Sequence, residues 1–407
     1  MSATKRKDKS RVVLRSGEVQ RANGSYQYSW MDGSGKRRYV YAKTLEELRI
    51  KEEQIAKDKS DGIKTEARYT TLNEMFDLWK TLKRGLKDNT NYKYMYTKYV
   101  SDDLGLKNIS SIKYSDIKKF YISLIRERGF KPNSIENINT ILHPVFSMAV
   151  RDGYIRVNPS SGVMAEIKKR HNWEKNKRHA LTITEQEAFV NFLSGSYMYR
   201  RWLPLFTVFL GTGCRVGEII GLRWEDCDFD DGIISINHNL IYRQQDSGRC
   251  EYHITTPKTK SGERVVPMLC EVREALMKER EYQEIEGFNE TVIDGYSGFI
   301  FKNRFGNVHS PMGINRVIDR IVKEHNKQEK MLAEQEGREP LIIPHFSVHN
   351  LRHTFCTRFC ENETNIKIIQ EIMGHADITT TMDIYNEATK EKKKESFAGL
   401  EGKIKIC

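Results

Sequence analysis

The stretch from His345 to Tyr385, HFSVHNLRHTFCTRFCENETNIKIIQEIMGHADITTTMDIY, concentrates histidine and arginine ahead of a single tyrosine. His349 and Arg352 are three residues apart and would share one face of a helix. His375 follows a glycine, and Tyr385 comes ten residues later. Guanidinium and imidazole groups bind phosphate, and a tyrosine hydroxyl can attack it. We interpret the stretch as part of a site that holds a phosphate and attacks it.

A metal site and a buried core helix are the other interpretations of this stretch. It contains four potential metal ligands at helical spacing: His349, His353, Cys356 and Cys360. One continuous helix cannot surround a metal ion tetrahedrally with four ligands, and Phe355 and Phe359 favour packing in a core. We therefore expect neither a metal nor a cofactor.

Two upstream segments offer further cations. The glycine-rich GTGCRVGEIIGL, residues 211–222, predicts a turn that delivers Arg215 at the start of a short helix, with Glu218 one turn on. The segment PKTKSGER predicts a hairpin that carries Lys258 and Lys260. Two arginines can hold the nonbridging oxygens of a phosphodiester, and a lysine can protonate the leaving oxygen. An ordered set therefore suits phosphoryl transfer from DNA to tyrosine: Arg215, Lys260, His349, Arg352, His375 and Tyr385.

The positive charge lies in the first 180 residues. The chain has 407 residues and a formal net charge of +12. Residues 1–67 carry 16 Lys/Arg against 10 Asp/Glu, residues 68–180 carry 22 against 11, and residues 181–407 carry 29 against 34. A surface this basic favours a polyanion as partner.

Neither a secretory signal nor a membrane span is expected. The basic N-terminus leads into no apolar segment, and the longest apolar run, residues 203–210, is far shorter than the roughly 20 residues of a membrane helix. The seven cysteines are scattered without the spacing of a disulfide framework. This pattern favours a reducing cytosol.

The first 170 residues predict a small sheet followed by helices. Residues 25–30 and 37–41 alternate aromatic and polar side chains around a DGSG turn, and residues 11–14 are a candidate third strand. A capped helix is expected from Thr44. Apolar spacing and start signals predict four helices within residues 68–170.

Several basic side chains in these regions are candidates for contact with DNA. They are Arg21, Lys36, Arg37, Arg38, Lys93, Lys98, Lys168, Lys169 and Arg170. The tyrosines of residues 91–99 suit a helical core and a DNA contact equally well. The basic run at residues 168–178 has little apolar pattern, which is typical of an interdomain linker.

Beyond residue 180 the pattern predicts a mainly helical region. Thr184 and Glu187 form a candidate capping box for its first helix. Further helices are expected at residues 202–210, 270–286 and 314–327, the last followed by an exposed charged insertion at 330–339. Strands are expected at residues 233–236, 253–256, 265–267 and 299–301. The second and third of these strands would flank the lysine hairpin.

The order Arg, Lys, His-x-x-Arg, His, Tyr resembles that of the tyrosine recombinase (phage integrase) family. GTGCRVGEIIGLRW is similar to the family's first arginine segment and TKSG to its lysine hairpin. HNLRHTF resembles its His-x-x-Arg segment, and IMGHADITTTMDIY its final segment. PKTKSGERVVPM and LRHTFCT are most similar to integrases of Gram-positive conjugative transposons. The resemblance is strong over residues 180–390.

The resemblance implies a reaction that cuts, exchanges and rejoins DNA strands without metal or ATP. In it, Tyr385 would be the nucleophile that forms a 3′-phosphotyrosyl link. Arg215 and Arg352 would hold the scissile phosphate between them.

The resemblance also assigns the remaining site residues. Lys260 would be the general acid, with Lys258 as the alternative two residues away. His349 would act as acid and base, and His375 would hydrogen-bond or position the phosphate. Glu218 would support the site structurally.

A multidomain α+β architecture follows from the resemblance. Residues 1–67 would form a three-stranded sheet with one helix that binds arm sites, and residues 68–170 an all-α, SAM-like domain that binds core sites. Residues 171–179 would be a linker. Residues 180–407 would form a mixed, mainly α catalytic domain with a small antiparallel sheet and a C-terminal tail.

The expected partners follow in the same way. They are double-stranded DNA with core and arm sites, further copies of the chain in a tetramer on DNA, an excisionase and a host DNA-bending protein. We expect a cytoplasmic, nucleoid-associated location. A type IB topoisomerase and a catalytically silent DNA-binding protein are the alternatives. The arm-binding module argues against the first, and the complete set of six site residues argues against the second.

Overall fold

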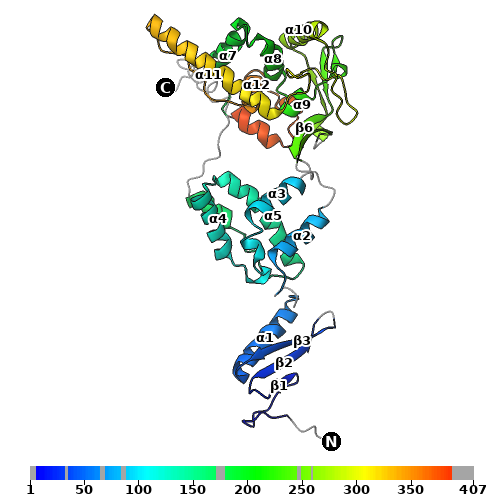
Figure 1. Ribbon diagram of the computed structural model, residues 1–407, viewed down its shortest axis with the longest axis vertical. Helices are drawn as coiled ribbons and strands as arrows, with labels where there is room; N and C mark the ends of the chain where they lie inside the picture. Colours follow the sequence, from blue (N-terminus) through cyan, green and yellow to red (C-terminus); the bar gives the residue numbers. More distant parts are fainter. Residues whose placement is uncertain are drawn as a thin grey trace, which may run out of the picture. The chain divides into compact units, whose positions relative to one another are not determined.

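The computed structural model describes residues 6–32, 35–64, 69–83, 89–170, 179–244, 249–257 and 260–386 (Figure 1). The chain divides into two compact units, Met1–Lys175 and Asn176–Cys407. The expected tail, residues 388–407, lies outside the described residues, as does the expected linker at residues 171–179 apart from His179. None of the described helices combines the length and apolar character that crossing a membrane requires.

The first unit begins with an antiparallel sheet covered by one helix (Figure 1). The sheet has the order β1-β2-β3, formed by Glu18–Gln20, Tyr26–Met31 and Arg37–Ala42. Helix α1, Leu45–Ser60, packs on β2 and β3. Thr44 caps this helix, because its side chain accepts a hydrogen bond from the backbone N–H of Glu47. The predicted helix start is therefore confirmed.

The third strand is β1, so the prediction of a strand at residues 11–14 is wrong. Arg11 has a φ of 62°, which an extended strand does not allow. Val13 forms only an isolated bridge with Lys7.

The rest of the first unit is helical. Its helices are α2 Leu72–Leu82, α3 Asn89–Tyr99, α4 Tyr114–Arg128, α5 Pro132–Arg151 and α6 Val163–Arg170, with 3-10 turns at Leu104–Leu106 and Ile109–Ser111. The four predicted helices are present. Helix α6 is not among the predicted helices, and it includes Lys168, the first residue of the basic run that is expected to be a linker. Val163 and Ile167 lie one turn apart and are buried in the core, which explains why the helix forms.

The tyrosines of α3 divide between core and surface. Tyr96 is buried and stacks on Phe76, with ring centroids 3.6 Å apart. Tyr94 is exposed, and its hydroxyl accepts a hydrogen bond from Lys98. Neither of the two predicted roles therefore applies to the whole group.

The second unit is mainly helical with two small sheets. Its helices are α7 Ile183–Gly195, α8 Leu203–Thr212, α9 Val216–Ile220, α10 Cys270–Glu286, α11 Pro311–Glu336, α12 Val348–Asn362 and α13 Ile366–Met373, with 3-10 turns at Arg200–Trp202, Trp224–Asp226 and Lys260–Gly262. Its strands are β4 Cys227–Asp228, β5 Ile233–Ile236, β6 Asn239–Gln244, β7 Cys250–Thr255 and β8 Arg264–Pro267. One sheet has the order β4-β5-β8 and the other pairs β6 with β7.

This pairing corrects the predicted hairpin. Strand β7 pairs with β6, whereas β8 pairs with β5, so the segment between β7 and β8 crosses from one sheet to the other. Val266 of β8 is buried in the main core together with Ile234 of β5. The apolar core therefore selects the partner of β8.

Three further expectations for this unit are wrong. The capping box of α7 is formed by Thr182 and Glu185, not by Thr184 and Glu187. The charged residues 330–336 continue α11 and do not form a separate insertion. Residues 299–301 do not form a strand. Phe299 makes an isolated bridge with Arg223, and its side chain is buried in the core.

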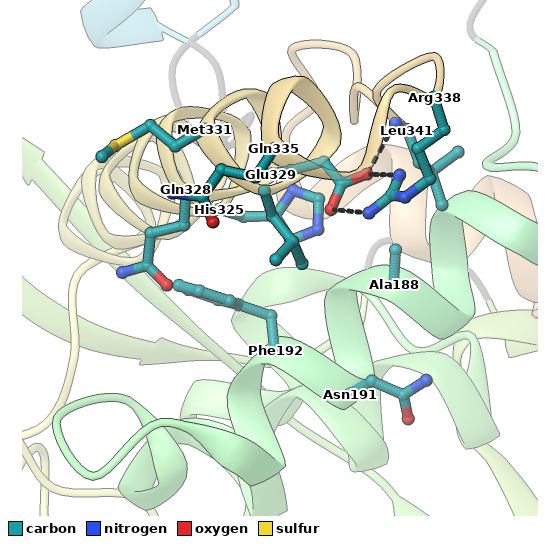
Figure 2. Close-up of a pocket in the computed structure, with 11 residues that line it drawn as sticks. Ala188, Asn191, Phe192, His325, Gln328, Glu329, Met331, Gln335, Arg338 and Leu341 are labelled. Atoms are coloured by element: carbon teal, nitrogen blue, oxygen red, sulfur yellow. Dashed lines mark hydrogen bonds and ion pairs between the residues drawn. The ribbon is translucent and has the colours of Figure 1, made fainter.

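Helices α7 and α11 border a groove of about 710 Å³ (Figure 2). The groove is lined by Phe192, His325 and Met331 among others, and the ion pair of Glu329 with Arg338 lies on its wall. Its lining includes none of the candidate catalytic residues.

Candidate active site

The turn between α8 and α9 delivers Arg215. Gly213 ends α8 with a φ of 60°, a conformation that favours glycine, and Arg215 is the N-cap residue of α9. The backbone N–H and the Nη1 atom of Arg215 each donate to the Glu218 carboxylate at 2.8 Å. Its Nη2 donates to the Gly374 carbonyl at 2.7 Å. The guanidinium is thus held on two sides, while 39% of the side chain stays exposed for a ligand.

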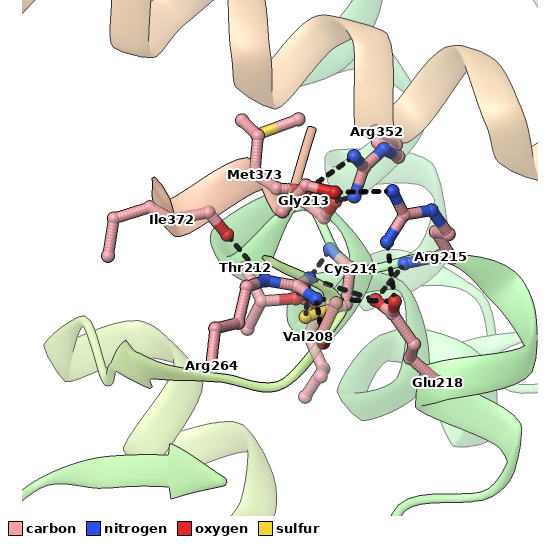
Figure 3. Close-up of polar contacts among 12 residues, drawn as sticks. Val208, Thr212, Gly213, Cys214, Arg215, Glu218, Arg264, Arg352, Ile372 and Met373 are labelled. Atoms are coloured by element: carbon pink, nitrogen blue, oxygen red, sulfur yellow. Dashed lines mark hydrogen bonds and ion pairs between the residues drawn. The ribbon is translucent and has the colours of Figure 1, made fainter. Parts of the chain in front are cut away.

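Glu218 lies buried between two arginines (Figure 3). Arg264 donates to its two carboxylate oxygens at 3.2 and 2.9 Å. Burial alone would raise the pKa of this carboxyl. The hydrogen bonds and charge of Arg264, together with Arg215, outweigh that effect and hold the pKa below its usual value. Glu218 thus pairs with both arginines, and its supporting role in the reaction stays a prediction.

Arg352 projects from α12 and is 6% exposed. Its Nη1 donates to the Gly213 carbonyl and its Nη2 to the Met373 carbonyl, each at 2.6 Å. Burial, and then the charge of Arg215, lowers the pKa of Arg352 to about 10. Two guanidinium groups share this site, so an anion bound between them would relieve their repulsion.

His375 follows the left-handed turn at Gly374, whose φ is 62°. Its Nδ1 lies 2.9 Å from the Thr381 hydroxyl. Burial, followed by the charges of Arg352 and Arg215, lowers the pKa of His375 to about 3. The imidazole is therefore neutral near pH 7 and can offer Nε2–H to a phosphate when Nδ1 accepts from Thr381.

His349 and the lysine turn approach the same place. His349 is exposed on α12, one turn before Arg352, and its charge contributes to the lowered pKa of His375. Lys260 begins the 3-10 turn Lys260–Gly262. A Cβ atom on Gly374 would lie 2.9 Å from the Ser261 carbonyl, so the backbone of this turn touches the His375 segment. The side chain of Lys260 and the whole of Lys258 lie outside the described part.

Tyr385 lies in a helical segment, residues 378–386. It packs against a small apolar cluster of Cys356, Cys360, Ile369 and Met373. Met373 links this cluster to the arginines, since its carbonyl accepts from Arg352. The structure therefore brings the arginines, Glu218, His375 and the lysine turn together and sets Tyr385 on the adjoining apolar cluster.

The alternative metal site is not supported by the described residues. Cys356 and Cys360 are buried in the apolar cluster that Phe355 and Phe359 flank. Within the described ranges, no three His, Cys, Asp or Glu side chains are arranged to hold a metal ion.

Sequence reasoning missed Arg264 and Thr381 as parts of the site. The alternation of β8 indicates an inward position for Arg264. Its side chain lies on the same face of the strand as buried Val266 and on the opposite face to exposed Val265. An arginine at an inward position of a strand indicates a buried partner. No pattern in the sequence singles out Thr381 among its neighbouring threonines.

The candidate DNA contacts differ in what they already bind. Arg21, Lys36, Arg37, Lys93, Lys98, Lys169 and Arg170 are exposed. Among them Lys98 donates to the Tyr94 hydroxyl, whereas Arg38 donates to the carboxylate of Asp32 at 2.8 Å and Lys168 to that of Glu136 at 2.6 Å. These two pairs make Arg38 and Lys168 weaker candidates than their neighbours.

Two arginines around a neutral imidazole, with a lysine turn and a tyrosine helix beside them, define a site for phosphate-ester chemistry. Residues 179–392 match the phage integrase family, and residues 1–59 match the DNA-binding domain of Tn916 integrase. The chain belongs to the phage integrase family. It is a tyrosine recombinase, a site-specific enzyme that cleaves and rejoins DNA.

Individual relatives agree with this assignment. The chain is 32% identical over 400 residues to the transposase from transposon Tn916 of Enterococcus faecalis, covering 95% of this chain and 94% of the relative. It is 26% identical over 384 residues to a XerC-like tyrosine recombinase of Caldanaerobacter subterraneus, covering 91% and 93%. A solved structure of the Tn1549 transposon integrase with a circular intermediate DNA has 29% identity and a TM-score of 0.69, covering 81% of this chain and 99% of that one.

Proposed function

We propose that this recombinase moves a conjugative transposon by joining and releasing its ends through a covalent 3′-phosphotyrosyl intermediate. The observation that carries the proposal is the convergence of Arg215, Arg352 and His375, which come from three separate segments, on one turn at residues 373–375. The relatives described above include the transposase from transposon Tn916 and a transposon integrase solved with a circular intermediate DNA.

Cleavage would begin with attack by Tyr385. Its hydroxyl oxygen forms a bond to phosphorus while the bond from phosphorus to the 5′ oxygen breaks. The tyrosine proton passes to His349, and Lys260 protonates the leaving 5′ oxygen. Rejoining reverses these transfers, so the enzyme conserves the energy of the phosphodiester without ATP.

The two arginines would stabilise the charge that develops on the nonbridging oxygens. Arg215 and Arg352 are already fixed by backbone carbonyls and by Glu218, so little reorganisation accompanies the reaction. His375 adds a hydrogen bond without adding charge. This role is consistent with its neutral imidazole.

DNA would contact the first unit on two surfaces. The open face of the N-terminal sheet presents Arg37, Tyr39 and Tyr41, and Arg21 stacks over the ring of Tyr41 at 5.1 Å. We assign this face to arm sites. The α3 surface with Lys93 and Lys98, and the end of α6, would contact core sites through phosphates.

Strand exchange between two duplexes requires four active sites, so we propose a tetramer on DNA. In this proposal residues 1–67, 68–170 and 180–407 are three domains, and residues 388–407 contact a neighbouring copy. An excisionase and a host DNA-bending protein would set the direction. The enzyme would work in the cytoplasm, at the nucleoid.

A nicked suicide substrate tests the proposal. Its core-site DNA loses a short fragment after cleavage, so the covalent complex accumulates. Tyr385→Phe should abolish covalent capture but leave DNA binding intact, because only the attacking oxygen is lost. Capture is measured as a shifted band on a denaturing gel, and binding by gel mobility. Undiminished capture by Tyr385→Phe would overturn the assignment.

A further inference from the structure

We propose that Arg264 is a positioning residue for cleavage, which fixes the lysine turn, residues 260–262, against the segment that carries His375. The proposal rests on the roles of Lys260 and Tyr385 given above. Arg264 begins β8, and only 5% of its side chain is exposed. It is too enclosed to be a general DNA contact.

The guanidinium of Arg264 has five N–H groups and five acceptors. Its Nε donates to the Ile372 carbonyl at 2.7 Å (Figure 3). Its Nη1 donates to the Gly262 carbonyl and to Glu218, both at 3.2 Å. Its Nη2 donates to Glu218 at 2.9 Å and to the Cys214 sulfur at 3.5 Å. The side chain is therefore fully engaged in one geometry.

These acceptors belong to separate parts of the active site. Gly262 ends the turn that Lys260 begins, and Ile372 comes three residues before His375. Glu218 holds Arg215. Arg264 is thus a buried cation that connects three parts of the site. They are the turn that carries Lys260, the segment that carries His375, and, through Glu218, Arg215.

The lysine turn and the His375 segment touch at Gly374. A Cβ atom there would lie 2.9 Å from both the Ser261 carbonyl and Arg264 Nη1. The contact leaves no room for a side chain at residue 374. A small shift of the lysine turn would therefore also move the segment that carries His375. A lysine in place of Arg264 keeps the charge but lacks the planar fork of donors, and it cannot bind all of these acceptors at once.

Two roles of Arg264 can be distinguished by chemistry. If Arg264 positions Lys260, its loss impairs protonation of the leaving oxygen. If it acts only through Glu218 on Arg215, its loss impairs the stabilisation of phosphate charge. Replacing the bridging 5′ oxygen by sulfur removes the need for protonation, because a thiol with a pKa of about 8.5 leaves readily as a thiolate.

The experiment measures covalent capture by the full-length protein on nicked core-site DNA, with either oxygen or sulfur at the 5′ bridging position. The variants are Arg264→Lys, Lys260→Ala and Arg215→Ala. Arg201→Lys is the matched control. Arg201 also pairs with a buried glutamate, but this residue, Glu279, belongs to α10 and is not among the candidate catalytic residues. Melting temperatures report whether each variant is folded.

With oxygen, Arg264→Lys should cleave about 100-fold more slowly than wild type, the usual contribution of a general acid. With sulfur it should recover to within about tenfold of wild type, as Lys260→Ala should. Arg215→Ala should remain slow on both substrates, and Arg201→Lys should stay close to wild type. Equal slowing of Arg264→Lys on both substrates, or a wild-type rate with oxygen, would overturn the proposal.

Gly262→Ala is a second variant that should displace the lysine turn while Arg264 itself is unchanged. A Cβ atom at Gly262 would lie 2.5 Å from the Cβ atom of Pro257, so it displaces the turn from its other side. The same recovery with sulfur is expected, and its absence counts against the proposal. Failure of the proposed function would look different, since Tyr385→Phe would then still be captured or wild type would not react with the sulfur substrate.

Discussion

The pKa of His375 separates its role from that of His349. Burial and two neighbouring guanidinium groups leave the His375 imidazole neutral, whereas His349 is exposed at the start of α12. A neutral hydrogen-bond donor suits the phosphate, and an accessible imidazole suits proton exchange with the tyrosine. We therefore propose different tasks for the two histidines, although both lie near Arg352.

The lowered pKa of His375 predicts a pH-dependent stability. The unfolded histidine takes up a proton near pH 6.5, but the folded one does so only near pH 3. Stability from this group is therefore complete above pH 6.5 and falls as the pH drops toward 3, by at most about 1.4 kcal/mol per pH unit. Urea unfolding between pH 4 and 7 should show a shallower dependence for His375→Asn.

His345→Gln is the control for this measurement, because its side chain is exposed and replacing it changes the histidine count equally. A pH dependence for His375→Asn as steep as that of wild type would show that the buried imidazole does not carry the effect.

The two lysines of the segment between β7 and β8, Lys258 and Lys260, can be ranked by single substitutions. We expect Lys260→Ala to slow cleavage about 100-fold or more, the range of a lost general acid, and Lys258→Ala to have a much smaller effect. Lys260 begins the turn whose next residue, Ser261, lies against Gly374. The measurement is the rate of covalent capture of the suicide substrate. The reverse order would move the general acid to Lys258.

At the scale of single elements, strand alternation sorts the basic residues of β3. Arg38, Val40 and Ala42 face α1, and Val40 and Ala42 belong to its apolar cluster. Arg37, Tyr39 and Tyr41 are exposed on the opposite face. No sequence pattern ranks Arg37 above Arg38 as a DNA contact, whereas the burial pattern of the strand distinguishes them.

Arg37→Ala should therefore weaken binding to arm-site DNA, while Arg38→Ala should not. Losing one phosphate contact should lower the slope of log affinity against log salt by about 1. Arg38→Ala is the matched control, because its guanidinium is already paired with Asp32. Fluorescence anisotropy at several salt concentrations measures both. Equal losses of affinity for the two variants would mean that another surface binds the arm site.

At the scale of the whole molecule, the proposed domain division separates cleavage from the bridging of distant sites. Deleting residues 1–67 should leave cleavage of a core-site suicide substrate within a few fold of wild type. The same deletion should impair complexes that join core and arm sites, which native gels with two labelled DNAs can detect. Arg156 loses its ion pairs with Asp58 and Asp61 in this variant, but the Arg156 side chain is 43% exposed, so the loss should cost little stability. Loss of core-site cleavage would contradict the division.

The sequence by itself predicted the class of chemistry, because six candidate side chains occur in a fixed order that one reaction would explain. It also predicted most helices, since apolar spacing and caps such as Thr44 act locally. Helix α6 was not predicted because it is short and only its residues Val163, Met164 and Ile167 pack on the core.

Only the tertiary structure decided which segments meet. The partner of β8 is set by burial of Val266 beside Ile234, a contact between residues that are far apart in the chain. The same is true of the active site, where Arg264 meets Glu218, Gly262 and Ile372. Local patterns report the conformation of a segment, whereas the pairing of distant segments depends on which arrangement buries the most apolar surface and satisfies each buried charge.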